Sequence, residues 1–283
     1  MTTVAVVGLG LIGGSLLRAL STVDSVGYDV DPATRAAAAA AGHRIAPTAQ
    51  SAAAGADVVV VATPLPAVAA VFGQLAAALG PAAVVTDVAS VKVPARSLAR
   101  SLLPVHRYVG GHPMAGTHQS GWSTGDPRLL QNAGWALCLD EETDLAAWSS
   151  VAVLVIGLGA RVVPLTSAEH DAAVAKVSHL PHLLAAVLAA GVADDPIALA
   201  LAAGSFRDGT RVAATRPELT AAMCEANAAA LRPVADAAAA RLATASRDGV
   251  RALLEAGHAA RSAFDVAPGR RRVQIAADDS AAL

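Results

Sequence analysis

The residues best suited to chemistry lie in three short runs of histidine and arginine among small residues. In the first run, Gly110-Gly111-His112-Pro113-Met114-Ala115-Gly116-Thr117, glycine is too frequent for a helix or a regular strand. The run therefore places one imidazole on a loop after an expected strand, a common position for functional residues. An imidazole with an ordinary pKa of about 6.5 accepts a proton near neutral pH. We predict that His112 is a catalytic base; a structural histidine is the alternative.

The second and third runs supply imidazole and guanidinium groups further along the chain. Ser178-His179-Leu180-Pro181-His182 has two imidazoles three positions apart, but no HExxH pattern or carboxylate partner completes a metal site. We therefore expect no metal. Phe206-Arg207-Asp208-Gly209-Thr210-Arg211 offers two guanidinium groups on an expected helix-breaking turn. Arginine binds carboxylates bidentately, which suits a dianionic substrate, and an exposed ion-paired loop is the alternative.

A glycine motif near the N-terminus predicts a dinucleotide site. Gly8-Leu9-Gly10-Leu11-Ile12-Gly13 follows the expected strand Val4–Val7 and opens a helix. Gly8 is expected to form the tight turn, Gly10 to admit a pyrophosphate, and Gly13 to let the helix pack on the strand. The positive end of the helix then faces the phosphates. The alternative is a glycine-rich turn without a ligand.

Polar residues at the ends of other expected strands complete this site. Asp29 ends the second strand, where a carboxylate binds both ribose hydroxyls and repels a 2′-phosphate, so we predict NAD rather than NADP. Thr63-Pro64 and Ser90 end two further strands and should line the cofactor cleft, because ligands of open α/β sheets bind at the carboxyl ends of strands. Helix capping is the alternative role for Thr63-Pro64 and Ser90, and helix capping or a solvated position is the alternative for Asp29.

The elements that must position these residues change in type near residue 165. Before it, short β-branched runs alternate with alanine-rich helical stretches, which predicts a Rossmann-type, doubly wound α/β domain over residues 1–165. The expected strands are Val4–Val7, Val26–Tyr28, Asp57–Ala62, Ala83–Asp87, Arg107–Val109, Trp135–Leu139 and Arg161–Val163. Residues 166–283 read as an all-α domain. Its many apolar helical positions predict a face buried by another subunit.

Composition excludes several classes of protein. The 283 residues are 54% hydrophobic, mostly alanine, valine and leucine, but glycine, proline and polar residues interrupt every window of about 18. No membrane span and no leader are expected, and the predicted location is the cytoplasm. Aromatic residues at 3% and a net charge of −2 argue against a nucleic-acid partner. These properties indicate a soluble enzyme with a small-molecule substrate.

Five motifs in order resemble those of the prephenate/arogenate dehydrogenase family, from Thr3 to about Asn227. The resemblance implies a Rossmann domain, a helical dimerisation domain and an active site between them. The motifs are Gly8-Leu9-Gly10-Leu11-Ile12-Gly13-Gly14-Ser15, Asp87-Val88-Ala89-Ser90-Val91-Lys92, Gly111-His112-Pro113-Met114-Ala115-Gly116, Ser178-His179-Leu180-Pro181-His182 and Phe206-Arg207-Asp208-Gly209-Thr210-Arg211.

The resemblance also implies roles for individual residues. His112 is similar to the histidine that hydrogen-bonds the substrate's C4 hydroxyl, Ser90 to the serine that orients it, and Arg211 to the arginine that binds a carboxylate. The other implied substrate-pocket residues are Thr117, His118, Ser178, His182, Arg207 and Asp208. Two positions depart from the family pattern. His118 stands where relatives often have an acidic residue, and Thr220 where they often have an aromatic one.

The implied reaction is the NAD-dependent oxidative decarboxylation of prephenate to 4-hydroxyphenylpyruvate in tyrosine biosynthesis. Oxidation of arogenate to tyrosine is the first alternative. His118 favours prephenate, because a protonated imidazole repels the arogenate ammonium, whereas Asp208 could attract it. The further alternatives are another two-domain hydroxy-acid dehydrogenase and a redox-sensing module that holds NAD without turnover.

Overall fold

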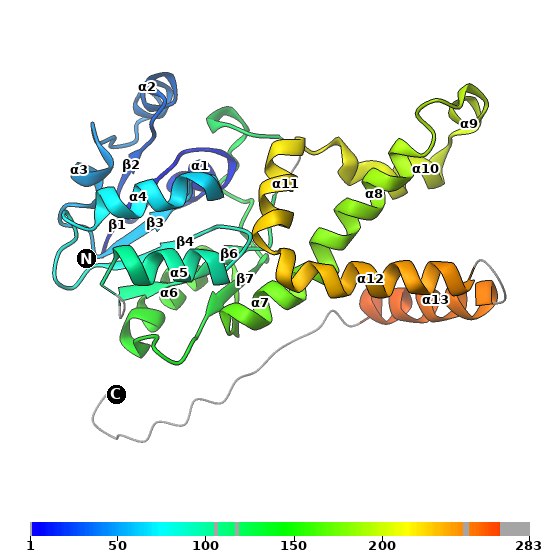
Figure 1. Cartoon of the computed structure of the whole chain (residues 1–283). Helices are drawn as coiled ribbons and strands as arrows, with labels where there is room; N and C mark the ends of the chain where they lie inside the picture. Colours follow the sequence, from blue (N-terminus) through cyan, green and yellow to red (C-terminus); the bar gives the residue numbers. More distant parts are fainter. Residues whose placement is uncertain (1, 105–106, 117–118, 246–248, 267–283) are drawn as a thin grey trace.

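The computed structural model describes residues 2–104, 107–116, 119–245 and 249–266. It consists of an N-terminal α/β part and a C-terminal helical part that extends from one side of it (Figure 1). Thr117 and His118, which sequence analysis assigns to the substrate pocket, lie outside the described residues.

A parallel five-stranded sheet forms the centre of the N-terminal part, with the strand order β2-β1-β3-β4-β5. Chain order reverses between β1 and β3, so the switch point of the sheet lies beside the glycine motif that follows β1. The strands are β1 (Thr3–Val7), β2 (Asp24–Tyr28), β3 (Val58–Val61), β4 (Val84–Asp87) and β5 (Tyr108–Val109). This arrangement confirms the predicted Rossmann-type sheet.

Helices cover both faces of this sheet because alternate residues of its buried strands point to opposite sides. Val4 and Val6 belong to one apolar core with residues of α1 and α6, whereas Ala5 and Val7 belong to a second core with α3, α4 and α5. The helices are α1 (Leu11–Ala19), α2 (Pro32–Ala40), α3 (Ala49–Ala53), η1 (Leu65–Ala67), α4 (Val68–Leu75), α5 (Val93–Leu102) and α6 (Leu145–Gly157).

A second, three-stranded sheet corrects two expectations. The predicted strands near residues 135 and 161 do form, as β7 (Gly134–Cys138) and β8 (Arg161–Leu165), but they do not continue the first sheet. Instead, β7 pairs with both β8 and β6 (Gly111–Pro113), in the order β6-β7-β8. The prediction that the glycine-rich run contains no regular strand is wrong for β6. Gly111 permits this strand, because a Cβ atom there would lie 2.6 Å from the carbonyl oxygen of Asp87.

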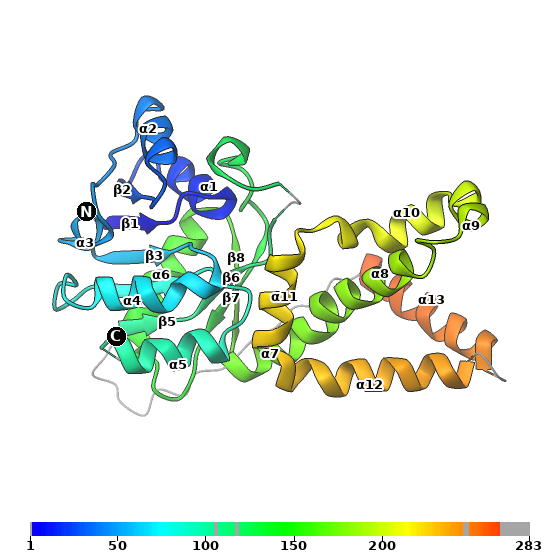
Figure 2. The same ribbon diagram turned by 45° about the horizontal axis from the view of Figure 1, so that its top comes forward.

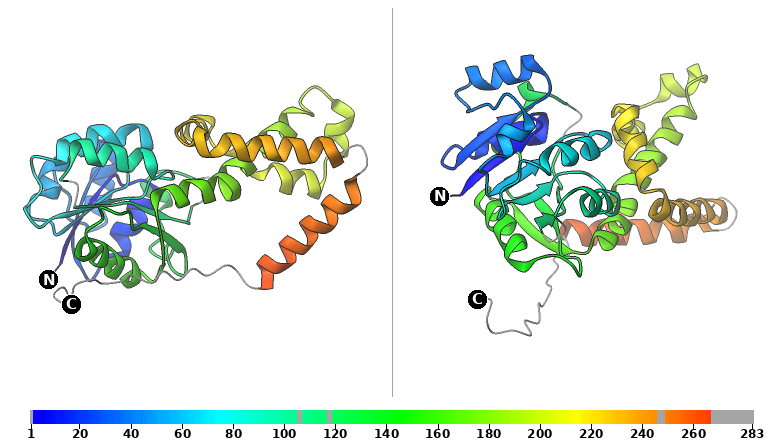
Figure 3. Two further views of the ribbon diagram at one scale, coloured as in Figure 1. Left: turned by 60° about the horizontal axis from the view of Figure 1, so that its bottom comes forward. Right: turned by 60° about the vertical axis from the view of Figure 1, so that its left-hand side comes forward.

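The described residues of the C-terminal part form helices joined by short turns, as predicted, and this part projects away from both sheets (Figures 2 and 3). The expected turn over residues 206–211 is instead helical. The elements are α7 (Ser167–Val174), the π-helical turn η4 (Ala175–His179), α8 (Leu180–Ala190), α9 (Pro196–Leu201), α10 (Gly204–Thr210), η5 (Arg211–Ala214), α11 (Pro217–Ala226), α12 (Ala228–Thr244) and α13 (Val250–Val266); η3 (Trp122–Thr124) precedes β7.

The continuous helix Ser167–Ala190 leaves much of its apolar surface uncovered. Val177 and Val187 are 68% and 69% exposed, and further large apolar side chains are exposed on α9, α12 and α13. Among the described residues, this helix alone is long and apolar enough to span a membrane by length and composition. Its buried residues His170, Asp171 and His179 form hydrogen bonds within the protein, however. Exposed apolar surfaces of this size are uncommon on monomeric proteins.

Candidate active site

The glycine motif has the local geometry that a dinucleotide site requires. Gly8 has φ +98°, and a Cβ atom there would lie 2.7 Å from the carbonyl oxygen of Ala62. A Cβ atom on Gly13 would collide with the carbonyl oxygen of Gly8, so α1 and β1 pack together only through glycine. Gly10 is different, because nothing lies within 4 Å of its Cβ position. The space above it is open at the N-terminus of α1, where a pyrophosphate would bind.

Asp29 lies directly beside this loop. Its Oδ2 atom accepts a hydrogen bond from the backbone N–H of Leu9 at 2.7 Å, and its Oδ1 atom accepts one from the N–H of Asp31 at 2.9 Å. The N-cap of α2 is Asp31, whose side chain accepts bonds from Ala33 and Thr34. Asp29 therefore does not have the capping role that was its alternative, and its carboxylate remains available beside the glycine loop.

The residues that follow β3 pack against the other side of the glycine loop from Asp29. The Cγ2 atom of Thr63 would touch a Cβ atom on Gly8 at 3.0 Å, and the hydroxyl of Thr63 is buried with no partner among the described residues. Pro64 beside it is exposed, and Leu11 and Ile12 are half-buried in the first turn of α1. An open glycine, a helix N-terminus, a carboxylate and an unpaired buried hydroxyl fit a bound dinucleotide.

His112 lies in β6, just beyond the carboxyl end of β5. Its backbone pairs with Ala136 of β7, which fixes the direction of the half-buried side chain. The Nδ1 atom lies 2.8 Å from the Nε2 atom of His170, and the Nδ1 atom of His170 lies 2.8 Å from the Oδ1 atom of Asp171. Two imidazoles and a carboxylate thus form a continuous chain of hydrogen bonds.

Asp171 connects this chain to the start of α5. Its Oδ1 atom accepts a hydrogen bond from the backbone N–H of Lys92 at 2.7 Å, and its Oδ2 atom accepts one from the N–H of Val93 at 2.9 Å. Burial acts to raise the pKa of Asp171, but the hydrogen bonds from His170, Lys92 and Val93 hold that pKa below its ordinary value. The carboxylate is therefore ionised at neutral pH.

A buried ion pair holds β6 against the main sheet. The Nζ atom of Lys92 lies 2.5 Å from the Oδ1 atom of Asp87 and donates to the carbonyl oxygen of Gly111 at 2.6 Å. The N–H of Gly111 donates in return to Asp87 at 3.0 Å. Because Gly111 precedes His112 in the chain, this network positions the imidazole. Ser90 is half-buried on the loop that joins β4 to α5, two residues before Lys92.

The imidazoles of His112 and His179 are neutral at physiological pH. Burial, followed by the charges of His170, Lys92 and His179, holds the pKa of His112 well below its ordinary 6.5. Burial also lowers the pKa of His179 to about 4. Asn227 lies 3.1 Å from the Nδ1 atom of His179, and the Nε2 atom of His179 is buried without a partner among the described residues. His112 has the protonation state of a base.

The other predicted pocket residues lie on the helical part. Ser178 and His182 are half-buried at the π turn and on α8. Arg207, Asp208 and Arg211 are exposed on α10 and η5, and none of them forms an ion pair within the part of the chain that the structure describes. The described contacts therefore do not bring these three residues against His112.

An apolar cavity of about 250 Å³ lies between α8, η5 and α11. His182 and Thr220 are among its polar lining residues. A positive charge on His182 would also lower the pKa of His179.

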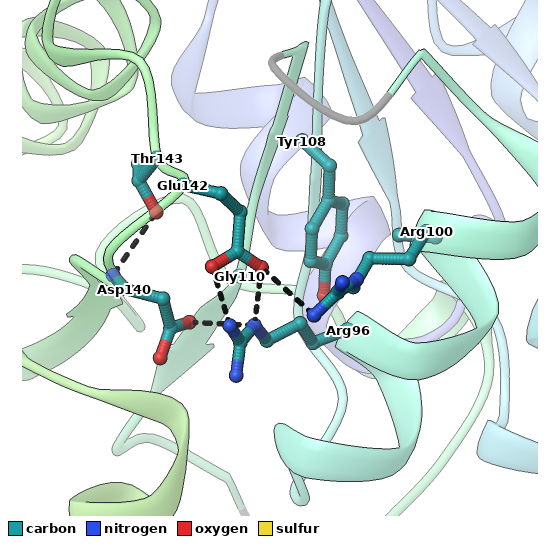
Figure 4. A pocket seen from close by; sticks show the side chains of 8 residues that line it. Arg96, Arg100, Tyr108, Gly110, Asp140, Glu142 and Thr143 are labelled. Carbon is teal, nitrogen blue, oxygen red and sulfur yellow. Dashed lines mark hydrogen bonds and ion pairs between the residues drawn. The ribbon is translucent and has the colours of Figure 1, made fainter.

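A second cavity near the site is structural. Arg96 on α5 pairs with Glu142 and Asp140, which follow β7, and Arg100 and Tyr108 complete its wall (Figure 4). The free space is about 10 Å³, which holds one water molecule. Asp140 also accepts hydrogen bonds from the N–H and hydroxyl of Ser167 at the start of α7. This cluster therefore joins α5 to α7 and has no room for a substrate.

The hydrogen-bonded network behind His112 was not predicted from the sequence. His170, Asp171 and Asn227 had no predicted role, and Lys92 was noted only as the last residue of a motif. A signal was present: Glu169-His170-Asp171 places an imidazole and a carboxylate in the first turns of an otherwise apolar helix, directly after the expected strand near residue 161. Within the described residues, no group of three or more histidine, cysteine or acidic side chains could hold a metal ion.

Comparison with known proteins shows the same pattern along nearly the whole chain. The model of the prephenate dehydrogenase nucleotide-binding domain matches residues 12–164, and that of the prephenate dehydrogenase dimerization domain matches residues 166–250. A cyclohexadienyl dehydrogenase of Zymomonas mobilis is 35% identical in an alignment of 263 positions that covers 87% of this chain and 89% of the relative.

Two solved structures resemble this one. A Corynebacterium glutamicum protein described as a candidate prephenate dehydrogenase is 36% identical, with a TM-score of 0.88 over 94% of this chain and 88% of that chain. The prephenate dehydrogenase of A. aeolicus, in complex with hydroxyphenyl propionate and NAD+, is 25% identical, with a TM-score of 0.82 over 94% and 96% of the two chains.

Proposed function

This chain belongs to the prephenate dehydrogenase family, and we propose that it catalyses the NAD-dependent oxidative decarboxylation of prephenate to 4-hydroxyphenylpyruvate in tyrosine biosynthesis. One observation carries the proposal most directly. A neutral imidazole, His112, follows β5 at the same edge of the sheet at which the glycine loop follows β1. A base beside a nicotinamide site suits the oxidation of an alcohol.

The residues of the glycine loop and the neighbouring strand ends would hold the cofactor. NAD, when bound, supplies the acceptor for the hydride from C4 of the substrate. The backbone around Gly10 faces the pyrophosphate, and Asp29 binds the ribose hydroxyls. The remaining residues proposed to contact NAD are Gly8, Leu11, Ile12, Gly13, Thr63 and Pro64.

In the proposed mechanism, His112 controls the proton of the C4 hydroxyl. It draws this proton as the C4–O bond gains carbonyl character, and Ser90 helps to orient the hydroxyl. The bond between the ring and its carboxylate then breaks, CO2 leaves, and the electron pair of that bond completes the aromatic ring. The proton returns to the phenolic oxygen, so the chain itself is unchanged at the end of the cycle.

The helical part is proposed to bind the two carboxylates of the substrate. Arg211 binds the ring carboxylate, because a guanidinium forms two parallel hydrogen bonds to a carboxylate. Arg211 is exposed and has no ion-pair partner among the described residues, so its charge is available. The further residues proposed to shape the pocket are Thr117, His118, Ser178, His182, Arg207 and Asp208.

Prephenate is the proposed substrate in preference to arogenate. The two differ at the side chain, where prephenate has a keto group and arogenate has an ammonium group, and a buried ammonium needs a carboxylate partner. His118 provides none. Arogenate is the second candidate because Asp208 is an exposed carboxylate without an ion pair among the described residues. The test is NADH formation with each substrate, in the wild type and in His118→Glu. A wild type that favours arogenate would reverse the assignment.

The same assay separates the remaining alternatives. A different hydroxy-acid dehydrogenase would form NADH with 2- or 3-hydroxy acids and not with prephenate. A redox-sensing module would bind NAD and form no NADH with either. We expect rapid NADH formation with prephenate, whether or not arogenate is also oxidised when it is tested separately.

We also propose a cytoplasmic homodimer, with the domain boundary between residues 165 and 166. The exposed apolar side chains of α8, α9 and α13 support this assembly, because monomers rarely leave such a face uncovered. They include Val187, Ile197, Leu201 and Leu254. Light scattering at micromolar concentration should report twice the mass of the chain. Leu201→Asp, which places a charge on that face, should shift the mass toward the monomer, and a stable monomeric wild type would refute the proposal.

A further inference from the structure

The chain of hydrogen bonds behind His112 has a direction that the chemistry of its members determines. It begins at Asp171, whose two oxygens face the backbone N–H groups of Lys92 and Val93. A backbone N–H only donates, so the carboxylate only accepts. The Nδ1 atom of His170, 2.8 Å from the same carboxylate, must therefore carry a proton and donate it.

The same donor-to-acceptor reasoning applies to the hydrogen bond between the imidazoles of His170 and His112. A neutral imidazole with a proton on Nδ1 has a lone pair on Nε2. The Nε2 atom of a neutral His170 accepts a hydrogen bond, and in that case the atom 2.8 Å from it, Nδ1 of His112, is the donor. The proton of neutral His112 is then on Nδ1, and the lone pair is on Nε2. That lone pair is the one a base needs to receive a substrate proton.

The parts that form this chain are rigid. His170 and Asp171 are 1% and 4% exposed, and the two imidazole rings meet edge to face with their centres 5.1 Å apart. A capping box between Thr166 and Glu169 fixes the first turn of α7, which carries both residues. The side-chain amide of Asn227 donates to the carbonyl oxygen of Asp171 at 2.8 Å and holds the other side of the turn.

We propose that His170 is a positioning residue: it fixes the tautomer and orientation of His112 so that Nε2 of His112 faces the substrate hydroxyl as a proton acceptor, and Asp171 anchors it. The inference rests on the proposed function for the role of His112. It adds that the base is held by a residue of the C-terminal helical part, so its alignment requires both parts of the chain to be packed as in this structure.

The first experiment reads the tautomer directly. The wild-type protein is labelled with 15N in its histidine rings, and the His112 signals are assigned by their loss in His112→Asn. His43→Phe is a matched control, because that imidazole packs edge-on against Trp122, outside the network. The proposal expects a protonated Nδ1 and an unprotonated Nε2 on His112. A proton on Nε2 of neutral His112 would overturn it.

The second experiment measures turnover at saturating NAD and prephenate. His170→Phe should lower kcat by about 10- to 100-fold, the scale for a misaligned catalytic group, with little change in the affinity for NAD. His170→Gln should retain more activity than His170→Phe, because its side-chain oxygen can accept the hydrogen bond from His112. His43→Phe should retain wild-type kcat. A His170→Phe enzyme within about twofold of the wild type would overturn the proposal.

A double-mutant cycle distinguishes positioning from general support of the fold. If His170 acts through His112, then His170→Phe in a His112→Asn background should change kcat by less than about twofold. A further tenfold loss there would show that His170 acts elsewhere and would overturn the proposal. If His170→Phe does not fold, the tautomer of His112 in the wild type and the kcat of His170→Gln still test the proposal. A wild type that oxidises neither prephenate nor arogenate would refute the proposed function. The tautomer measurement needs no substrate, so its result does not depend on that outcome.

Discussion

The carboxylate of Asp29 lies 2.7 Å from the backbone N–H of Leu9, inside the glycine loop. The residue proposed to bind the ribose thus also holds the loop that receives the pyrophosphate. A substitution that removes the oxygen would disturb both features, whereas asparagine keeps an acceptor for Leu9 and removes only the charge.

We therefore expect the wild type to have a higher kcat/KM with NAD than with NADP, and Asp29→Asn to reduce that ratio by about tenfold, a difference of about 1.4 kcal/mol. The cause is the lost repulsion between the carboxylate and a 2′-phosphate. Asp31→Asn is the matched control, because Asn is an equally good N-cap for α2 and the ratio should stay unchanged. Equal efficiency with both cofactors in the wild type would contradict the role of Asp29.

His112→Asn should bind NAD normally and lose about two to four orders of magnitude in kcat, the usual scale for removing a positioned acid–base group. NAD affinity from fluorescence titration and kcat from NADH formation give the two quantities. Near-normal turnover in this variant would assign His112 a purely structural role.

Arg211→Ala should mainly raise the KM for prephenate, by about 10- to 100-fold, because a charge-assisted bond to a carboxylate is worth about 1.5–3 kcal/mol and forms in both ground and transition states. Arg207→Ala, four positions earlier on α10, is the comparison variant. If KM rises only in Arg207→Ala, the carboxylate contact belongs to that arginine.

Stability should fall as the pH drops below 6.5. The pKa of His179 is lowered from 6.5 to about 4, chiefly by burial, so the folded state binds fewer protons than the unfolded state between these values. The resulting stabilisation is complete above pH 6.5 and is lost as the pH falls toward 4, at about 1.4 kcal/mol per pH unit. The lowered pKa of His112 acts in the same direction.

Urea unfolding at pH 7.5, 6 and 5 measures this dependence. His179→Gln removes the titrating group, so its free energy of unfolding should change less steeply with pH over this range than that of the wild type. Identical slopes for the two proteins would show that His179 does not carry the effect.

The nucleotide half of the molecule could be predicted from sequence because its signals are local. Strand, glycine turn and helix follow one another within residues 3–19, and each glycine answers a steric requirement inside that segment. The N-cap of α2 is equally local, since Asp31 bonds to residues two and three positions away. Such signals need no knowledge of the rest of the fold.

The network behind His112 depends on contacts that are distant in sequence, and these gave no local signal. β6 forms because it meets β7, and glycine composition alone argued against a strand there. His170 and Asp171 look like surface residues of a helix until α7 packs against α5, which buries both. The reverse holds for the motif that contains Arg207, Asp208 and Arg211. It can be recognised in the sequence, but among the described residues these three side chains have no ion-pair partner.

The π-helical turn Ala175–His179 also governs the helix that follows it. Compared with a regular α-helix, such a turn inserts one extra residue and rotates everything after it by about 100°. The turn therefore lets one helix direct its side chains to two different surfaces. Before the turn, His170 and Asp171 face β6 and α5, and after it His182 faces the cavity beside α11. An uninterrupted α-helix of the same composition could satisfy only one of the two. Deleting a single exposed residue of the turn, such as Lys176, would erase the offset without removing any side chain of the hydrogen-bonded chain.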